Sequence, residues 1–386
     1  MSKQKSMRIA VVGAGLGGLA AAGLLQRAGF GVSVYEQAPV FSRLGAGIHL
    51  GPNVTRVLRA LGLENRLVET GIRPDAWVSR DWQSGDVSFV CPLRDRSERE
   101  YGAPYLTVHR GDFHAELVNA VEPNTVQFGK KLVNCIERDN SVDIFFEDGS
   151  EAEADLVIGA DGVNSRIRDI LLGPEEPIYT GYVAHRSIFP AALMKSYSIN
   201  DCTKWWSDDR HIVVYYITRP RDEIYFVTGV PEANWKSGQS SIETDLSSLR
   251  AAFAGFHPEV QEILNVCPQA TTWPILERNP LELWSRGRIV MLGDACHPMK
   301  PHMGQGAGMA IEDAAMLVRC LEKVGMEDYK FAFQLYELNR KGRTADVQRA
   351  SHENTWLRYP MNPDWVFAYD AFKEPLNYPK PSVKRA

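Results

Sequence analysis

The sequence has little of what marks secreted, metal-binding or nucleic-acid-binding proteins. Its 386 residues include six cysteines and no C-x-x-C pair, which argues against a disulfide scaffold or structural zinc site and favours a reducing cytoplasm. The formal net charge of −5 leaves no basic excess for nucleic acid or an anionic membrane. Internal repeats and low-complexity tracts are also absent. These absences predict a cytoplasmic globular protein without a bound metal, long enough for two domains.

An apolar run near the start of the sequence is too short to cross a membrane. It extends from Ile9 to Leu25, fewer than the ~20 residues of a transmembrane helix. Because Lys3 and Lys5 precede it, the run also has the pattern of a secretory leader. A discarded leader would not need Glu36 at its position beyond the run, so we favour a nucleotide-binding interpretation.

The same stretch contains a G-x-G-x-x-G motif at Gly13, Gly15 and Gly18. A buried strand is expected before it, over 9–12, and an Ala/Leu-rich helix after it, over 16–27. In this context the first glycine permits a tight turn, the second lets the backbone approach a pyrophosphate, and the third lets the helix pack on the strand. The helix N-terminus adds free N–H groups and a positive dipole end, so the motif predicts a dinucleotide site.

An acidic residue closes the second predicted strand. Glu36 follows the apolar residues 32–35 directly. From there its carboxylate is placed to accept a hydrogen bond from a ribose hydroxyl, and it would repel a 2′-phosphate.

Strand-and-turn patterns recur further along the chain, at 155–162 and 289–295. Between them, residues 178–230 are rich in aromatic and β-branched residues, which is typical of a separate antiparallel sheet. Residues 93–104 are charged and are expected to form a loop, as is the glycine-rich segment 45–51 that contains His49.

These patterns predict an α/β protein with a Rossmann-like nucleotide-binding domain, an inserted and mostly antiparallel β substrate domain, and C-terminal helices. We expect the nucleotide-binding domain to be discontinuous because the β-rich segment interrupts it. The predicted ranges are 1–75, 100–178 and 275–325 for the nucleotide-binding domain, 76–99 and 179–274 for the substrate domain, and 326–386 for the C-terminal helix and tail.

Three turns carry specific motifs: G-A-G-L-G-G at 13–18, I-G-A-D-G at 158–162, and G-D-A at 293–295 followed by Q-G at 305–306. In this order they resemble the motifs of the FAD-dependent aromatic hydroxylases, the single-component flavoprotein monooxygenases, over most of residues 7–325. Only one G-x-G-x-x-G motif is present, so the resemblance implies bound FAD, with NADH as a transient electron donor.

The resemblance also implies which residues hold FAD. Arg110 is similar to a family arginine beside the ribityl–phosphate portion, and Leu132 to a position whose backbone meets adenine. Asp294 would accept from a ribityl hydroxyl, and the helix beginning near Gly306 would direct its N-terminus at the flavin. The alternatives are a surface cation for Arg110 and a helix cap for Asp294. The implied cofactor-binding set is Gly13, Gly15, Gly18, Glu36, Gln37, Arg110, Leu132, Asp161, Asp294, Gly306 and Ala307.

Histidines and a tyrosine are the candidates for proton transfer. His211 and Tyr215 share one face of a predicted strand, roughly 13 Å apart at ~3.3 Å per residue, which is wide enough to bracket one ring. Each candidate taken alone is more often a structural residue. The segments GAGIHLGPNV, VAHRS, KWWSDDRHIVVYY and GDACHPMKPHM are similar to those of the family's decarboxylating pyridine-ring hydroxylases. That resemblance implies His49 and Tyr215 as proton-handling groups, with Cys202, His211 and His302 lining the substrate site.

The implied activity is that of an NADH-consuming monooxygenase that uses O2 through a flavin hydroperoxide. It would hydroxylate a small hydroxypyridine carboxylate and release CO2, as a monomer or homodimer, after His49 removes the proton of the ring hydroxyl. Two alternatives stay open: a salicylate or hydroxybenzoate hydroxylase of the same family, and a flavin-binding reductase or redox protein without oxygenase activity. A plain NAD dehydrogenase is a remoter alternative and would be colourless, whereas FAD would make the protein yellow.

Overall fold

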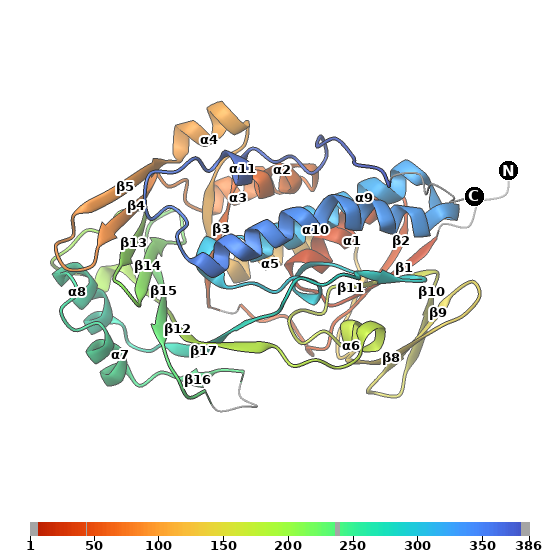
Figure 1. Cartoon of the computed structure of the whole chain (residues 1–386), viewed down its shortest axis with the longest axis horizontal. Helices are drawn as coiled ribbons and strands as arrows, with labels where there is room; N and C mark the ends of the chain where they lie inside the picture. The colour runs from red at the N-terminus through yellow and green to blue at the C-terminus, as the bar shows by residue number, and fades with distance from the viewer. Residues whose placement is uncertain (1–6, 44, 236–239, 380–386) are drawn as a thin grey trace, which may run out of the picture.

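Two large sheets organise the protein (Figure 1), which is represented by a computed structural model that describes residues 7–43, 45–235 and 240–379. Lys3 and Lys5, which suggested a leader, lie outside these residues. Within the described ranges, no helix has both the length and the apolar composition needed to cross a membrane. All six cysteines are buried and free.

The first sheet consists of β1 (Arg8–Val12), β2 (Gly31–Tyr35), β7 (Val126–Gln127), β11 (Leu156–Gly159), β18 (Ser285–Arg286) and β19 (Ile289–Met291). Its order is β18-β19-β11-β1-β2-β7, and every pair except β18–β19 is parallel. Because parallel strands end at the same edge of a sheet, the turns that follow β1, β11 and β19 meet there. The three motif-bearing turns of the sequence are therefore neighbours in space.

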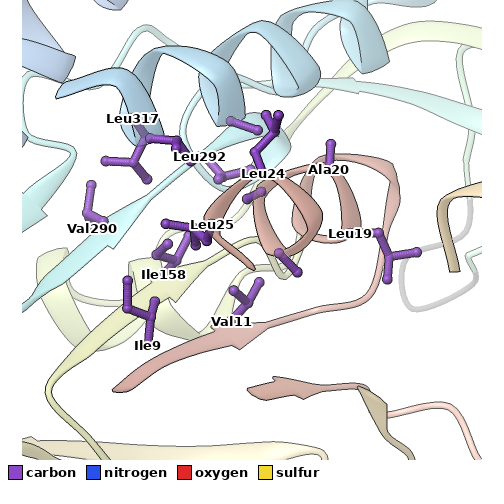
Figure 2. Packing of buried hydrophobic residues seen from close by; sticks show 14 of the residues in the cluster. Ile9, Val11, Leu19, Ala20, Leu24, Leu25, Ile158, Val290, Leu292 and Leu317 are labelled. Atoms are coloured by element: carbon purple, nitrogen blue, oxygen red, sulfur yellow. The ribbon is translucent and has the colours of Figure 1, made fainter. Parts of the chain in front are cut away.

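Three helices stack over this sheet: α1 (Leu16–Arg27), α9 (Gly306–Val324) and α10 (Tyr329–Glu353). α1 packs against α9, and α9 packs against α10 (Figure 1). Figure 2 shows Leu24 and Leu25 of α1 among Ile158, Val290 and Leu317, and all five side chains are buried. The packing is close because α1 is rich in glycine and alanine, and a Cβ at Gly17 would lie 2.9 Å from the Cβ of Ala310 on α9. This core fixes the helix N-termini relative to the sheet edge.

Smaller elements connect the sheet to the rest of the molecule. β3 (Gly47–Leu50) pairs antiparallel with β6 (Leu106–His109), and α5 (Arg110–Asn119) follows β6 directly. The remaining elements of this part are the strands β8 (Leu132–Glu137), β9 (Val142–Phe146) and β10 (Glu151–Ala154), and the helices α2 (Pro52–Ala60), α3 (Glu64–Thr70), α6 (Arg166–Leu172) and α11 (Asp364–Phe367).

The second sheet has eight strands in the order β16-β17-β12-β15-β14-β13-β4-β5. All neighbours are antiparallel except β13 and β4. The strands are β4 (Ala76–Asp81), β5 (Val87–Pro92), β12 (Ile178–Pro190), β13 (Cys202–Trp206), β14 (His211–Tyr216), β15 (Glu223–Pro231), β16 (Ile242–Glu243) and β17 (Thr271–Glu277). The strands of both predicted substrate-domain ranges lie in this sheet, and the exact domain boundaries stay a prediction.

The two faces of the second sheet differ. One face carries Trp205, Ile212 and Phe226, which form an apolar core that includes residues of α7 (Leu246–Ala252) and α8 (Pro258–Val266). The other carries Val213 and Tyr215, which pack with buried methionines of the 301–309 region. The second face is thus directed at the flavin-side loops predicted from the sequence.

Two local predictions are wrong. The charged segment 93–104 contains α4 (Arg94–Tyr101), because its charges pair along a helix, as between Arg96 Nε and Glu100 Oε2 at 2.6 Å. His49 lies in the paired strand β3 rather than in a loop, because Gly47 to Leu50 find hydrogen-bonding partners in β6. The β6 partner of β3 lies outside the local sequence, whereas the i,i+4 charge pairing of α4 was visible in it.

Candidate active site

The first two glycine-bearing turns pack against each other at the sheet edge. Gly13 has φ +102°, and a Cβ there would lie 2.4 Å from the carbonyl oxygen of Ala160. A Cβ at Gly18 would lie 2.1 Å from the carbonyl oxygen of Gly13. Both positions therefore require glycine for packing inside the protein.

Gly15 differs from these two glycines because it faces open space. A Cβ built there meets no described atom within 4 Å, and no side chain caps the α1 N-terminus that Gly15 precedes. Free N–H groups, a positive dipole end and room beside a glycine are what a pyrophosphate needs. The loop therefore fits the phosphate portion of FAD.

Replacing Gly15 with valine is expected to leave a folded protein that binds FAD poorly. The backbone at Gly15 is extended (φ −72°, ψ −179°), which valine adopts readily, but its methyl groups would fill the phosphate space. We expect the dissociation constant for FAD to rise at least ~10-fold, about 1.4 kcal/mol, in a titration followed by flavin fluorescence. Gly18→Val is the contrast: it should destabilise the fold itself. A Gly15→Val protein with full flavin content would contradict this assignment.

Two side chains form hydrogen bonds with the backbone of the glycine loop. Glu36 accepts hydrogen bonds from the backbone N–H groups of Ala14 at 2.9 Å and Ala38 at 2.8 Å. His114 Nε2 lies 2.7 Å from the carbonyl oxygen of Ala14 and donates to it. The predicted contact of Glu36 with a ribose stays a prediction, and its oxygens retain lone pairs for one. Gln37, the next residue in the sequence, is exposed, and its side chain forms no hydrogen bond with a described residue.

Asp294 lines a cavity, and Arg110 interacts electrostatically with Asp294 and Arg186 of that cavity wall. Asp294 follows β19 and its side chain is exposed to a cavity of about 620 Å³ that Arg186, Trp273 and Met299 also line. The Arg110 guanidinium donates no hydrogen bond to any described residue. Burial lowers the pKa of Arg110, and Arg186 lowers it further, whereas Asp294 opposes the shift. A fixed, unpaired cation of this kind suits a phosphate or another anionic part of a cofactor.

The N-terminus of α9 faces the same region. Gly306 and Ala307 are its first residues and are half-buried. Gln305 precedes them, and its Oε1 accepts a hydrogen bond from Asn53 Nδ2 at 3.0 Å. The first N–H groups of a helix have no intrahelical acceptor, so this end can stabilise negative charge on a reduced flavin.

The remaining predicted cofactor residues have local partners. Asp161 accepts from the Ser165 hydroxyl and, at 3.0 Å, from the Ile167 N–H, so its carboxylate caps α6. Leu132 begins β8 and is buried. Contacts of these two residues with FAD stay predictions.

The structure brings the two proton-handling candidates together. The rings of His49 on β3 and Tyr215 on β14 have centroids 4.2 Å apart. His49 Nδ1 also lies 3.0 Å from the hydroxyl of Tyr105, a buried residue that the sequence reading did not select. A Cβ at Gly47 would lie 2.6 Å from the Tyr215 ring, so this glycine permits the close approach of strand and ring.

The three substrate-site candidates lie on the same side of the second sheet. Cys202 on β13 pairs with Tyr215 on β14, and His211 is four residues before Tyr215 on that strand. His302, in the short turn before α9, lies edge-on to His211 with ring centroids 5.2 Å apart. All five predicted catalytic and substrate-site residues therefore border one region between this sheet and the α9 loop.

Burial sets the protonation states of this cluster. It lowers the pKa of His49 and of His302 to about 3, and it lowers that of His211 well below its usual value. Burial also raises the pKa of Tyr215 well above its usual value. At neutral pH the imidazoles are neutral and Tyr215 is an intact phenol. His49 can therefore accept a proton, whereas Tyr215 acts as a hydrogen-bond donor.

Comparison with known proteins assigns the family. The family described as FAD binding domain matches residues 6–350. The chain belongs to the FAD-dependent aromatic hydroxylases.

This hydroxylase is similar to curated relatives over nearly its full length. It is 59% identical to 6-hydroxynicotinate 3-monooxygenase of Bordetella bronchiseptica, over 97% of this chain and 98% of the relative. It is 57% identical to the protein of that name from Pseudomonas fluorescens, over 97% and 98%. Among solved structures, Klebsiella pneumoniae HpxO complexed with FAD and uric acid has a TM-score of 0.80 and 28% identity, covering 95% of this chain and 92% of that one. The predicted family, fold class and FAD cofactor are confirmed.

Proposed function

We propose that this hydroxylase converts 6-hydroxynicotinate, NADH, two protons and O2 into 2,5-dihydroxypyridine, CO2, NAD⁺ and water. The observation that carries the proposal is the 59% identity to a 6-hydroxynicotinate 3-monooxygenase over almost the whole of both chains. The histidine-rich site supports it, because neutral imidazoles can both donate to the oxygens of a hydroxypyridine carboxylate and accept its hydroxyl proton.

Bound FAD would supply the chemistry of hydride acceptance from NADH and activation of O2. The glycine loop, Arg110, Asp294 and the α9 N-terminus would hold it, as argued above. Oxygen transfer to a pyridine ring requires an electron-rich ring, and this is what the protein's own residues must provide.

His49 is the residue we propose to make the ring electron-rich. When its Nδ1–H donates to the Tyr105 oxygen, Nε2 carries the lone pair and can take the proton of the 6-hydroxyl, para to the carbon that bears the carboxylate. The Tyr215 phenol, next to His49, would donate a hydrogen bond to the resulting oxyanion. Loss of CO2 then restores the aromatic ring.

Apolar side chains around the site would exclude water. Met303, Met309 and Val213 are buried and belong to the same apolar cluster as Cys202 and Tyr215. A dry site protects reactive oxygen species from premature release as peroxide. We also propose a cytoplasmic location, for which the six free, buried cysteines argue, and a monomer or homodimer.

The test is an assay of the purified protein with 6-hydroxynicotinate. We expect the ring acid to accelerate NADH oxidation, with one 2,5-dihydroxypyridine and one CO2 formed for each NADH and O2 consumed. Salicylate and 3-hydroxybenzoate serve as comparison ring acids, and faster coupled turnover of either would assign the alternative substrate. NADH oxidation that no ring acid accelerates, or that yields no hydroxylated product, would overturn the oxygenase assignment.

A further inference from the structure

A buried lysine and an asparagine lie behind His211. Lys204 is on β13, shares a face with Cys202 and Trp206, and has no solvent exposure. Its Nζ donates to Asn354 Oδ1 at 2.9 Å and lies 3.6 Å from the centroid of the Trp206 indole. No described carboxylate forms an ion pair with this lysine. A fully buried amino group whose described neighbours are an amide and a ring face needs a functional or structural reason.

Asn354 links that lysine to His211. It directly follows α10 in the left-handed conformation (φ +51°), which asparagine tolerates better than most residues. Its oxygen faces Lys204 Nζ, so its amide nitrogen is left for His211 Nδ1, 3.4 Å away. An amide nitrogen can only donate, and therefore Nδ1 must present a lone pair. A neutral His211 then carries its hydrogen on Nε2.

His302 is held in the other tautomer, with its hydrogen on Nδ1 rather than on Nε2. Its Nδ1 lies 2.9 Å from the carbonyl oxygen of Ser351 and must donate to it. The hydrogen is thus on Nδ1, and the buried Nε2 has a lone pair with no described partner. The two rings, 5.2 Å apart, therefore differ in function: His211 offers a donor at Nε2, and His302 offers an acceptor.

We propose that Lys204 and Asn354 are positioning residues that hold His211 as a hydrogen-bond donor toward the anionic substrate. The inference rests on the proposed function, because it takes the region beside His211 to be the site of the ring acid. Lys204 orients the amide, the amide selects the ring nitrogen that carries hydrogen, and the other nitrogen of His211 donates to an oxygen of the substrate. Neither Lys204 nor Asn354 touches the reacting atoms.

Burial and the Trp206 ring act on the charge of Lys204 in opposite directions. Burial lowers the pKa of Lys204 well below its usual value, and the nearby Arg358 lowers it further. The Trp206 ring face opposes that effect by favouring the ammonium form. Burial is the main cause of the lowered pKa of His211 and of His302, and the charge of Lys204 lowers both further.

The test is Asn354→Asp in the FAD-loaded protein with ¹⁵N-labelled histidine. A carboxylate cannot donate, so the hydrogen of His211 should move to Nδ1, which nitrogen chemical shifts report directly. His211→Gln assigns the signals by removing them. We expect KM for 6-hydroxynicotinate to rise about tenfold while kcat changes less than about threefold, because binding loses a matched donor.

Three further variants separate positioning from folding. Asn354→Gly keeps the left-handed turn and deletes the amide, so it should bind FAD normally and share the raised KM. Lys204→Met should let the amide rotate and place part of the hydrogen on Nδ1. Asn124→Asp is the matched control, since Asn124 is an exposed asparagine with φ +63°, and it should behave as the wild type.

The outcomes are distinct. A His211 Nδ1 that stays free of hydrogen in Asn354→Asp, or a shifted hydrogen with unchanged KM, would overturn the proposal. The nitrogen shifts are measured without substrate, so a protein that fails to oxidise 6-hydroxynicotinate still reports whether Lys204 and Asn354 control His211.

Discussion

Replacing His49 with glutamine is expected to lower kcat for 6-hydroxynicotinate by about 10²- to 10⁴-fold, the usual range for loss of a general base, while the protein keeps its FAD. Glutamine can replace the hydrogen bond to Tyr105 but cannot accept a proton from the substrate. His49 has a free lone pair at neutral pH, and because burial lowers its pKa to about 3, the oxyanion formed beside it must stabilise the imidazolium. Without this step the ring stays too electron-poor for hydroxylation at carbon 3.

The measurement is formation of 2,5-dihydroxypyridine beside the NADH oxidation rate and the flavin absorption spectrum. His352→Gln is a matched control, because that histidine is 64% exposed at the end of α10 and should tolerate the change. A His49→Gln protein that is purified without flavin would place His49 in the cofactor site instead. Normal turnover by this variant would remove His49 from the mechanism.

Arg340→Met is expected to destabilise the protein by about 3–5 kcal/mol, because it breaks a buried ion network. Arg340 is fully buried on α10 and donates to Asp313 Oδ1 at 2.6 Å and Glu312 Oε2 at 2.7 Å. Although burial alone would raise it, His297 and Arg340 lower the pKa of Asp313 to about 2. Methionine would leave that carboxylate short of a partner in a fully buried site.

The same network supports the flavin loops, so weaker FAD binding should accompany the loss of stability. Asp313 Oδ2 accepts from the N–H of Gly293, next to Asp294, and Glu312 Oε1 accepts from Asn53 Nδ2, which also contacts Gln305. Loss of Arg340 should therefore loosen both the turn after β19 and the α9 N-terminus.

Urea unfolding with saturating FAD measures the stability change, and flavin release measures the second effect. Arg138→Met is the control: Arg138 is 55% exposed in its pair with Asp143, and such surface pairs contribute about 0–1 kcal/mol. Equal unfolding midpoints for wild type and Arg340→Met would show that the buried network contributes nothing.

The sequence was most informative where chemistry depends on consecutive residues. A phosphate-binding turn is largely local, because the spacing of Gly13, Gly15 and Gly18 can be recognised from consecutive residues. Glu36 could be found because it stands at the end of the next strand. Resemblance, rather than physics alone, supplied His49, Cys202 and His302 as candidates.

Residues that act through distant partners were missed. Tyr105 contacts His49 only because β6 pairs with β3. The residues next to Tyr105 in the sequence give no sign of that contact. In the sequence alone, Lys204 is one polar residue in an aromatic strand. Asn354 is the residue at the end of a polar helix. The alternation of Cys202 and Lys204 on one strand face was the available signal, yet it identifies no partner.

The sequence by itself determined the order of elements, the glycine turns and a dinucleotide site, because these follow from local backbone freedom and strand periodicity, and the family resemblance added FAD. Only the tertiary structure decided which nitrogen of each histidine carries hydrogen and which carboxylates are paired by Arg340. Those states depend on contacts between α10, the α9 loop and the second sheet, which bring together residues more than a hundred positions apart. Burial and hydrogen-bond direction, rather than residue type, set the chemistry of the site.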